Sequence, residues 1–357
     1  MDRQVNALDY STSTVFKKVK DISRPVYRYP YFDALKAIAI FMVVLQHCYI
    51  YLGNGMYEDS IVNQTVSMIS VPTFMLVSGY FYFTGSKNLE KFFKREGQLI
   101  LPFFLWSFFY FLAFHDIFYR DIGLGDFSLG LVVDPYFCSP IWFLRTLALI
   151  ISLAWICSRL RGHSDVLCMT GTFILFNILS FYVTKQFAIQ SIAANMGYFI
   201  IGYSLCKYQG INSHRFKQFG FICAVVFPAC ILLKVNDIQL GGTIFKACNY
   251  SGVITLAFIL SLVKDRKIIS WRPLQYLGKH TLEVYVTHFA IVYLLMLFNV
   301  PVIVELPFIC MIGYSILTIV ISLIIYGFIA RTPFKSLIYG KFSKNAPCAF
   351  RQYLNNA

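Results

Sequence analysis

Ten long apolar stretches constrain this chain more than any other feature of its sequence. They cover residues 34–52, 61–83, 98–114, 140–157, 166–184, 189–206, 218–235, 246–263, 281–298 and 302–330. A helix rises about 1.5 Å per residue, so each stretch can cross, or nearly cross, about 30 Å of hydrocarbon. Charged residues make up only 13% of the chain, against about 25% in soluble domains. We therefore predict an all-α polytopic membrane protein, a bundle of about ten transmembrane helices.

The distribution of basic residues gives the predicted helices an orientation, because cytoplasmic loops are enriched in Lys and Arg. If the N-terminus is cytoplasmic, the inside segments carry 25 of the 31 Lys and Arg residues and the outside segments carry two. We expect both termini to be cytoplasmic, with a basic segment over 1–33, a membrane domain over 34–330 and a basic tail over 331–357. The outer loop 115–139 is locally acidic and is expected to cover an outer opening.

The net charge of +14 does not indicate a nucleic-acid partner, because no soluble segment interleaves basic and aromatic residues. The ten cysteines form no CxxC pair and lie mostly in apolar stretches. We interpret them as small buried hydrophobic residues rather than as a disulfide or zinc framework. No HExxH-like spacing occurs, and we expect neither a metal site nor a bound cofactor.

Polar residues inside predicted spans are informative, because they are costly in a bilayer and usually face the bundle interior. Lys36 and His47 are eleven residues apart in the first span, which places both on one helix face, about 16 Å apart along the axis. Asp33 lies close to the same face. The face would offer an anion site near Lys36 at the cytoplasmic end of the span and a base, His47, toward its outer end. The alternative is a Lys that extends to the membrane surface and a His that hydrogen-bonds between helices.

Further polar residues lie in the second and fourth spans. Arg145 lies near the outer end of its span, where it needs a carboxylate, carbonyls or an anionic ligand, or else extends to the surface. Trp142 is typical of an interfacial anchor. Ser78 and Gly79 permit the close approach of either a ligand or a neighbouring helix.

The ninth span carries a polar stripe, because Thr281, Tyr285 and His288 follow the spacing i, i+4, i+7. The stripe would line a proton or substrate path, or would hydrogen-bond between helices. Glu283 lies on the opposite face, and Glu305 is either a partner for Arg145 or a solvated acid. The remaining histidines fall in or beside loops and are expected to be solvated: His115, His163, His214 and His280.

Four segments, in order, resemble the integral-membrane acyltransferase family 3, whose members O-acylate surface polysaccharides. They are YFDALKAIAIFMVVLQHC (31–48), VPTFMLVSGYFYF (71–83), SPIWFLRTLAL (139–149) and YLGKHTLEVYVTHF (276–289). The family shows a basic residue eleven positions before a His, then F-x-x-SG-[YF], a WF span start and LG-x-x-[ST]-L-x-x-Y-x-x-H. The usual basic residue is Arg; here it is Lys36, which cannot make a planar bidentate contact.

The resemblance implies a bacterial inner-membrane O-acyltransferase that moves an acetyl group from cytoplasmic acetyl-CoA to a hydroxyl of a surface or lipid-linked glycan. It implies that His47 is the general base, since a neutral imidazole accepts protons near pH 7. Lys36 and Asp33 would bind the donor, and Arg145 would stabilise the oxyanion or position the acceptor. The residues expected to line the cavity are Ser78, Gly79, Trp142, Tyr285 and His288.

Three other classes of function stay open at the level of sequence. A proton-coupled transporter or exporter would also bury Lys, Arg, Glu and His, although no internal repeat is visible. A relative could acylate peptidoglycan or a small metabolite. A membrane scaffold without activity is the third, and it leaves the shared face of Lys36 and His47 unexplained.

Overall fold

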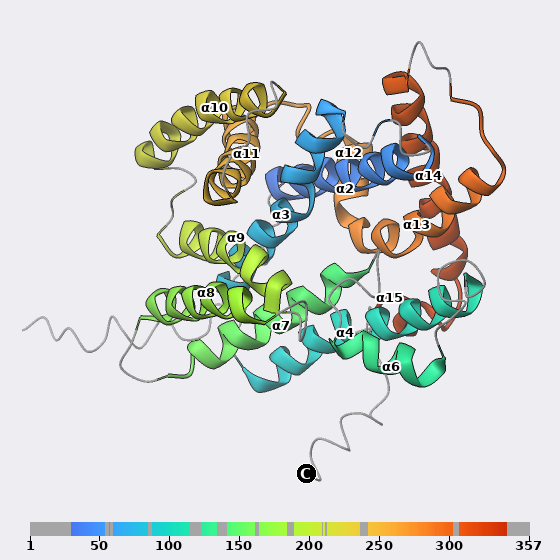
Figure 1. Cartoon of the computed structure of the whole chain (residues 1–357), viewed down its shortest axis with the longest axis horizontal. Helices are drawn as coiled ribbons and strands as arrows, with labels where there is room; N and C mark the ends of the chain where they lie inside the picture. The colour runs from blue at the N-terminus through green and yellow to red at the C-terminus, as the bar shows by residue number, and fades with distance from the viewer. Residues whose placement is uncertain are drawn as a thin grey trace, which may run out of the picture.

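The ten apolar stretches all form helices in the computed structural model (Figure 1). The structure describes residues 30–53, 57, 60–84, 88–114, 123–133, 141–160, 164–183, 189–208, 210, 213–235, 242–302 and 307–340. No strand occurs among these residues. The helices that match the predicted stretches are α2 (Pro30–Tyr51), α3 (Ile61–Thr84), α4 (Leu89–Ala113), α7 (Trp142–Cys157), α8 (Asp165–Tyr182), α9 (Ile189–Lys207), α10 (His214–Val235), α11 (Gly242–Leu262), α13 (Thr281–Leu297) and α14 (Pro307–Ile329).

Seven of the described helices are long and apolar enough to cross a membrane individually: α2, α3, α4, α8, α10, α11 and α14. Helices α12 (Arg272–Lys279) and α13 count as one further span if taken together, although they meet at an angle of 82°. Helix α7 is a shorter apolar helix of 16 residues. The protein is therefore a multi-pass, all-α membrane protein. A helix forms in each of the ten predicted stretches, but the predicted count of about ten transmembrane helices is not confirmed, because length and composition identify seven spans, or up to eight, among the described residues.

Helix α9 shows why an internal helix can fall short of the apolar character of a span. It lies in the middle of the bundle, where Ala193, Met196, Phe199 and Tyr203 are buried. It packs closely against α3, because two glycines remove the side chains that would separate the backbones. A Cβ at Gly202 would lie 1.8 Å from the Leu76 carbonyl oxygen. Since other helices surround it, α9 does not need an entirely apolar surface.

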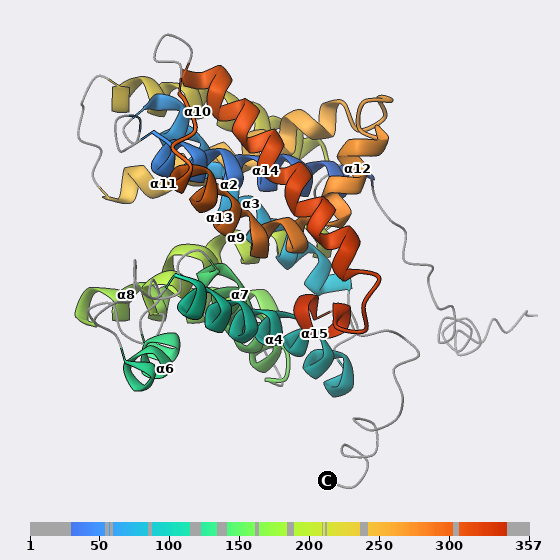
Figure 2. The same cartoon turned by 90° about the vertical axis from the view of Figure 1, so that its right-hand side faces the viewer.

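Three short helices were not expected from the sequence. Helix α6 (Leu124–Val133) lies in the predicted outer loop, α12 precedes α13, and α15 (Lys335–Tyr339) follows α14. Within α6, Phe127 is buried and its ring centroid lies 4.1 Å from that of Phe111 on α4. The outer segment is therefore partly a packed helix. Figure 2 shows α14 running across the bundle toward α15, which lies beside α4.

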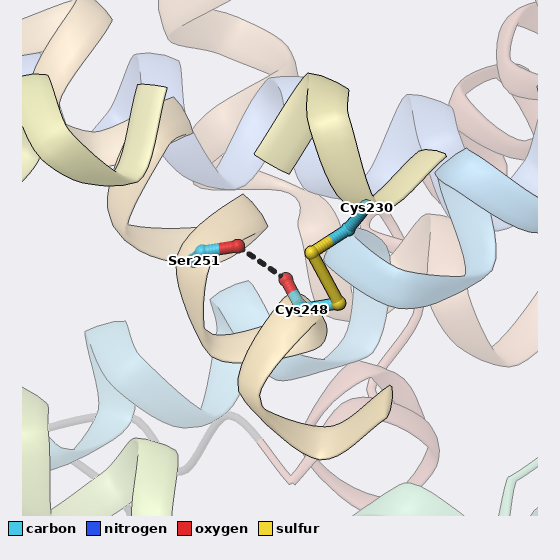
Figure 3. The surroundings of a disulfide bond; sticks show 3 residues. All are labelled: Cys230, Cys248 and Ser251. Atoms are coloured by element: carbon cyan, nitrogen blue, oxygen red, sulfur yellow. Dashed lines mark hydrogen bonds between the residues drawn. A yellow bond between two sulfur atoms is a disulfide. The ribbon is translucent and has the colours of Figure 1, made fainter. Parts of the chain in front are cut away.

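The interpretation of all ten cysteines as isolated hydrophobic residues is wrong for two of them. Cys230 on α10 and Cys248 on α11 form a disulfide, with their Cα atoms 5.9 Å apart (Figure 3). The Ser251 hydroxyl donates a hydrogen bond of 2.7 Å to the Cys248 carbonyl (Figure 3). The sequence did not reveal the pair because the two residues lie 18 positions apart, in different apolar stretches. Only the packing of α10 against α11 brings them together.

Candidate active site

Two histidines from opposite ends of the chain meet between α2 and α13. The ring centroids of His47 and His288 lie 4.8 Å apart, and the rings are nearly perpendicular. The polar face predicted for the first span and the polar stripe predicted for the ninth therefore belong to one site. The contact of α13 with α2 creates this juxtaposition.

Each imidazole has its proton position fixed by its own helix. The Nδ1 atom of His47 lies 2.8 Å from the Val43 carbonyl oxygen, and Nδ1 of His288 lies 2.6 Å from that of Tyr285. A carbonyl oxygen only accepts, so each Nδ1 carries the proton and donates it. Each Nε2 is then an acceptor. Among the described residues, no group hydrogen-bonds the buried Nε2 of His288.

The two rings differ in accessibility. His288 is fully buried, whereas His47 is partly exposed. A partly exposed imidazole with an unprotonated Nε2 can accept a proton from a hydroxyl group brought beside it. The arrangement therefore fits a general base, His47, with a second imidazole packed against it.

Aromatic side chains surround the histidine pair. Phe289 lies edge-on to His47 with ring centroids 6.0 Å apart, and the Tyr51 ring is stacked with the His47 ring at 6.2 Å. The Tyr110 hydroxyl donates a 2.8 Å hydrogen bond to the Val286 carbonyl and holds α4 against α13. These contacts limit access of water around the imidazoles, which strengthens polar interactions made there.

Tyr285 connects the histidine pair to α7. Its ring centroid lies 5.7 Å from that of His288 and 5.6 Å from that of Phe143. Trp142, expected as an interfacial anchor or a lining residue, begins α7 and is half-buried. The start of the fourth predicted span therefore lies against the polar stripe of the ninth.

Arg145 is buried rather than extended to the membrane surface, since it is only 8% exposed. Its Nη1 atom donates a 2.6 Å hydrogen bond to the Leu131 carbonyl, near the end of α6. Its guanidinium also lies 6.0 Å from the centre of the Phe103 ring on α4. Carbonyls at a helix C-terminus carry partial negative charge, so Arg145 stabilises the position of α6. The suggested partner Glu305 lies outside the described residues.

Lys36 is paired with Asp33 at the other end of α2. The Lys36 Nζ atom lies 2.8 Å from Asp33 Oδ1, and the Asp33 side chain is almost fully buried. Gly278 of α12 packs directly on this turn, because a Cβ there would lie 2.0 Å from the Asp33 carbonyl oxygen. The glycine of the LG motif in segment 276–289 is therefore needed where α12 crosses the start of α2.

Ser78 and Gly79 lie where α3 meets α9 and α4. A Cβ at Gly79 would lie 2.0 Å from the Phe199 carbonyl oxygen, so this position allows close helix packing. The Ser78 carbonyl accepts a 3.3 Å hydrogen bond from Arg95 Nη2. These contacts are those expected from the packing alternative.

The pairing of His280 with Glu283 was not predicted from the sequence. His280, expected to be solvated, has its Nδ1 atom 3.2 Å from Oε1 of Glu283, a residue that is fully buried. Tyr326 of α14 packs on the His280 ring, with centroids 4.6 Å apart. The i, i+3 spacing of His280 and Glu283 is compatible with a pair on one helix face. The sequence does not reveal the bend between α12 and α13, which turns both residues inward.

Comparison with known proteins identifies the family of the chain. A model of the acyltransferase family, described as an acyltransferase domain, matches residues 29–327. No curated protein and no solved structure matches the chain significantly. Within the described residues, no group of three or more His, Cys, Asp or Glu side chains is arranged to hold a metal ion. The match covers every predicted site residue and most of the chain, and the protein therefore belongs to acyltransferase family 3.

Proposed function

We propose that this protein transfers an acetyl group from cytoplasmic acetyl-CoA to a hydroxyl of a surface glycan or lipid-linked glycan at the bacterial inner membrane. Membership of the acyltransferase family supports group transfer, and the contact between His47 and His288 carries the assignment of the base. Both termini are placed in the cytoplasm, as the basic residues indicate.

The reaction needs one proton to move. The acceptor hydroxyl gives its proton to Nε2 of His47 while its oxygen attacks the thioester carbonyl. The carbon–sulfur bond then breaks, and the proton passes to the departing CoA thiolate. Atoms and charge balance without a metal or a redox partner. His288 packs against the imidazolium that forms and keeps the His47 ring in place.

The other predicted residues have roles that follow from their positions. Lys36, held by Asp33 at the inner end of α2, attracts the phosphates of the donor. Arg145 positions the acceptor or stabilises the oxyanion from the outer side, where α6 also lies. Tyr285 and Trp142 would line the substrate cavity that the resemblance implies, and Ser78 and Gly79 act through the packing of α3 against α9.

Purified protein given radiolabelled acetyl-CoA and candidate glycans tests the proposal. We expect label in the glycan with the native protein and less than about 1% of that rate with His47→Ala, since general bases typically contribute 10²–10⁴-fold. His214→Ala is the matched control, because His214 is exposed at the start of α10. Undiminished transfer by His47→Ala, or label that crosses vesicles without covalent attachment, would contradict it.

A further inference from the structure

The segment between α11 and α13, residues 264–279, combines exposed charge with exposed apolar side chains. Its one acidic residue is Asp265. All five of its basic residues are exposed: Lys264, Arg266, Lys267, Arg272 and Lys279. Ile268 is 66% exposed and Trp271 is 60% exposed. A surface of this kind suits the boundary between headgroups and acyl chains, where Trp and basic residues are both favoured.

We propose that residues 264–279 form a docking surface for anionic phospholipid headgroups of the cytoplasmic leaflet, and that this lipid contact steadies the first turn of α2. The proposal rests on the orientation given under the proposed function. Basic residues beside an anionic membrane each contribute about 1 kcal/mol, or roughly fivefold in affinity.

The segment is fixed to the protein on its other side. Ile269 is 2% exposed and packs in a cluster with Phe32 and Leu35 of α2. The Gln275 amide donates hydrogen bonds of 2.8 Å to the Pro30 carbonyl and 2.6 Å to the Ile269 carbonyl. One face of the segment is therefore built into the start of α2 and the other is left exposed.

The contact with α2 gives the docking surface a route to the donor site. Figure 1 shows α12 beside α2. Gly278 packs on the Asp33 carbonyl, and Asp33 holds Lys36. Lipid bound to 264–279 would favour the arrangement in which α12 crosses α2 and Asp33 positions the Lys36 ammonium.

The basic residues could instead bind the phosphates of a nucleotide. The apolar residues favour the membrane, because Ile268 and Trp271 would be left in water beside a soluble nucleotide, whereas a headgroup boundary takes them in. The two occupants predict different results in the same protein.

Lipid selectivity measures the docking surface directly. The full protein is placed in phosphatidylcholine vesicles with spin-labelled phosphatidylglycerol, and its association is compared with that of spin-labelled phosphatidylcholine. We expect Arg266→Gln/Lys267→Gln to reduce the preference for phosphatidylglycerol by about 25-fold, because each lost charge removes roughly a factor of five. We also expect high salt to weaken the preference of the native protein.

Lys91→Gln/Lys94→Gln is the matched control, because it removes the same charge from exposed positions at the start of α4. An equal loss in this control would overturn the proposal, since it would show a general effect of net charge. An unchanged preference in Arg266→Gln/Lys267→Gln, or a loss of acetyl-CoA binding in detergent with the lipid preference intact, would also overturn it. Lipid association is measured without acyl transfer, so the lipid preference can be interpreted even if the transfer assay fails.

Discussion

At the scale of single residues, the site depends on how two imidazoles are held. Both donate from Nδ1 to a carbonyl of their own helix, and both therefore present an unprotonated Nε2. The sequence identified His47 and His288 separately, each with a plain alternative as a hydrogen bond between helices. In the structure the two rings contact each other, so the role of each histidine has to be tested together with that of the other.

Substituting His288 distinguishes its packing role from its Nε2 atom. In His288→Asn, the amide nitrogen takes the place of Nδ1 and can still donate to the Tyr285 carbonyl, while Nε2 is removed. We expect kcat for acetyl transfer to fall by about ten- to a hundredfold, less than for His47→Ala, with the KM for acetyl-CoA within about twofold of the native value. Initial rates over a range of acetyl-CoA concentrations measure both constants.

A change confined to KM would contradict a positioning role for His288. His280→Asn tests whether the effect is specific, because His280 is a half-buried histidine on the bend before α13 that pairs with Glu283 instead of with His47. A kcat as low as that of His288→Asn in this second variant would indicate a general disturbance of α13.

At the scale of helices, small residues decide which pairs pack closely. Gly79 and Gly202 lie on facing helices, and each leaves room for a backbone carbonyl of the other helix. The sequence permitted either a ligand or a helix beside Ser78 and Gly79. Gly79 lies against the Phe199 carbonyl, so the neighbour at this position is helix α9.

Gly79→Ala is expected to destabilise the protein, because its new methyl group would overlap the Phe199 carbonyl and force α3 and α9 apart. A loss of about 1–3 kcal/mol is typical of overpacking. The midpoint of thermal unfolding in detergent gives the measurement. Gly313→Ala on α14 is the control, because nothing lies within 4 Å of a Cβ there. An equal Tm in the two variants would show that the α3–α9 contact can relax without cost.

At the scale of the whole molecule, the oxidation state of the cysteines depends on the orientation of the chain in the membrane. The predicted orientation places Cys230 and Cys248 in the outer halves of α10 and α11, where disulfides persist in an oxidising compartment. The same orientation places Cys157 and Cys168 at the inner ends of α7 and α8, and both are free thiols.

Peptide mapping after alkylation without reductant therefore tests the orientation. We expect a linked peptide pair containing Cys230 and Cys248, and alkylated, unlinked Cys157 and Cys168, when the protein is isolated from its native membrane. Oxidation of the inner pair together with alkylation of the outer pair would reverse the orientation. Expression in cells without disulfide-forming activity outside the cytoplasm should leave all four residues alkylated.

The sequence by itself determined the helical class and the ten stretches in which the long helices form, and it supplied the candidate residues for the site. Spans are read from local composition, because a helix in lipid satisfies its backbone hydrogen bonds within itself. The positions of Lys36, His47, Tyr285 and His288 on one side of their helices also follow from local periodicity.

Only the tertiary structure decided which of these helices touch. It paired His47 with His288, Cys230 with Cys248, and Arg145 with α6. It also showed that α12 bends sharply before α13 and crosses α2 at Gly278. Such pairings depend on side-chain packing and close backbone contacts between segments far apart in the chain, and neither hydropathy nor periodicity within one segment carries that information.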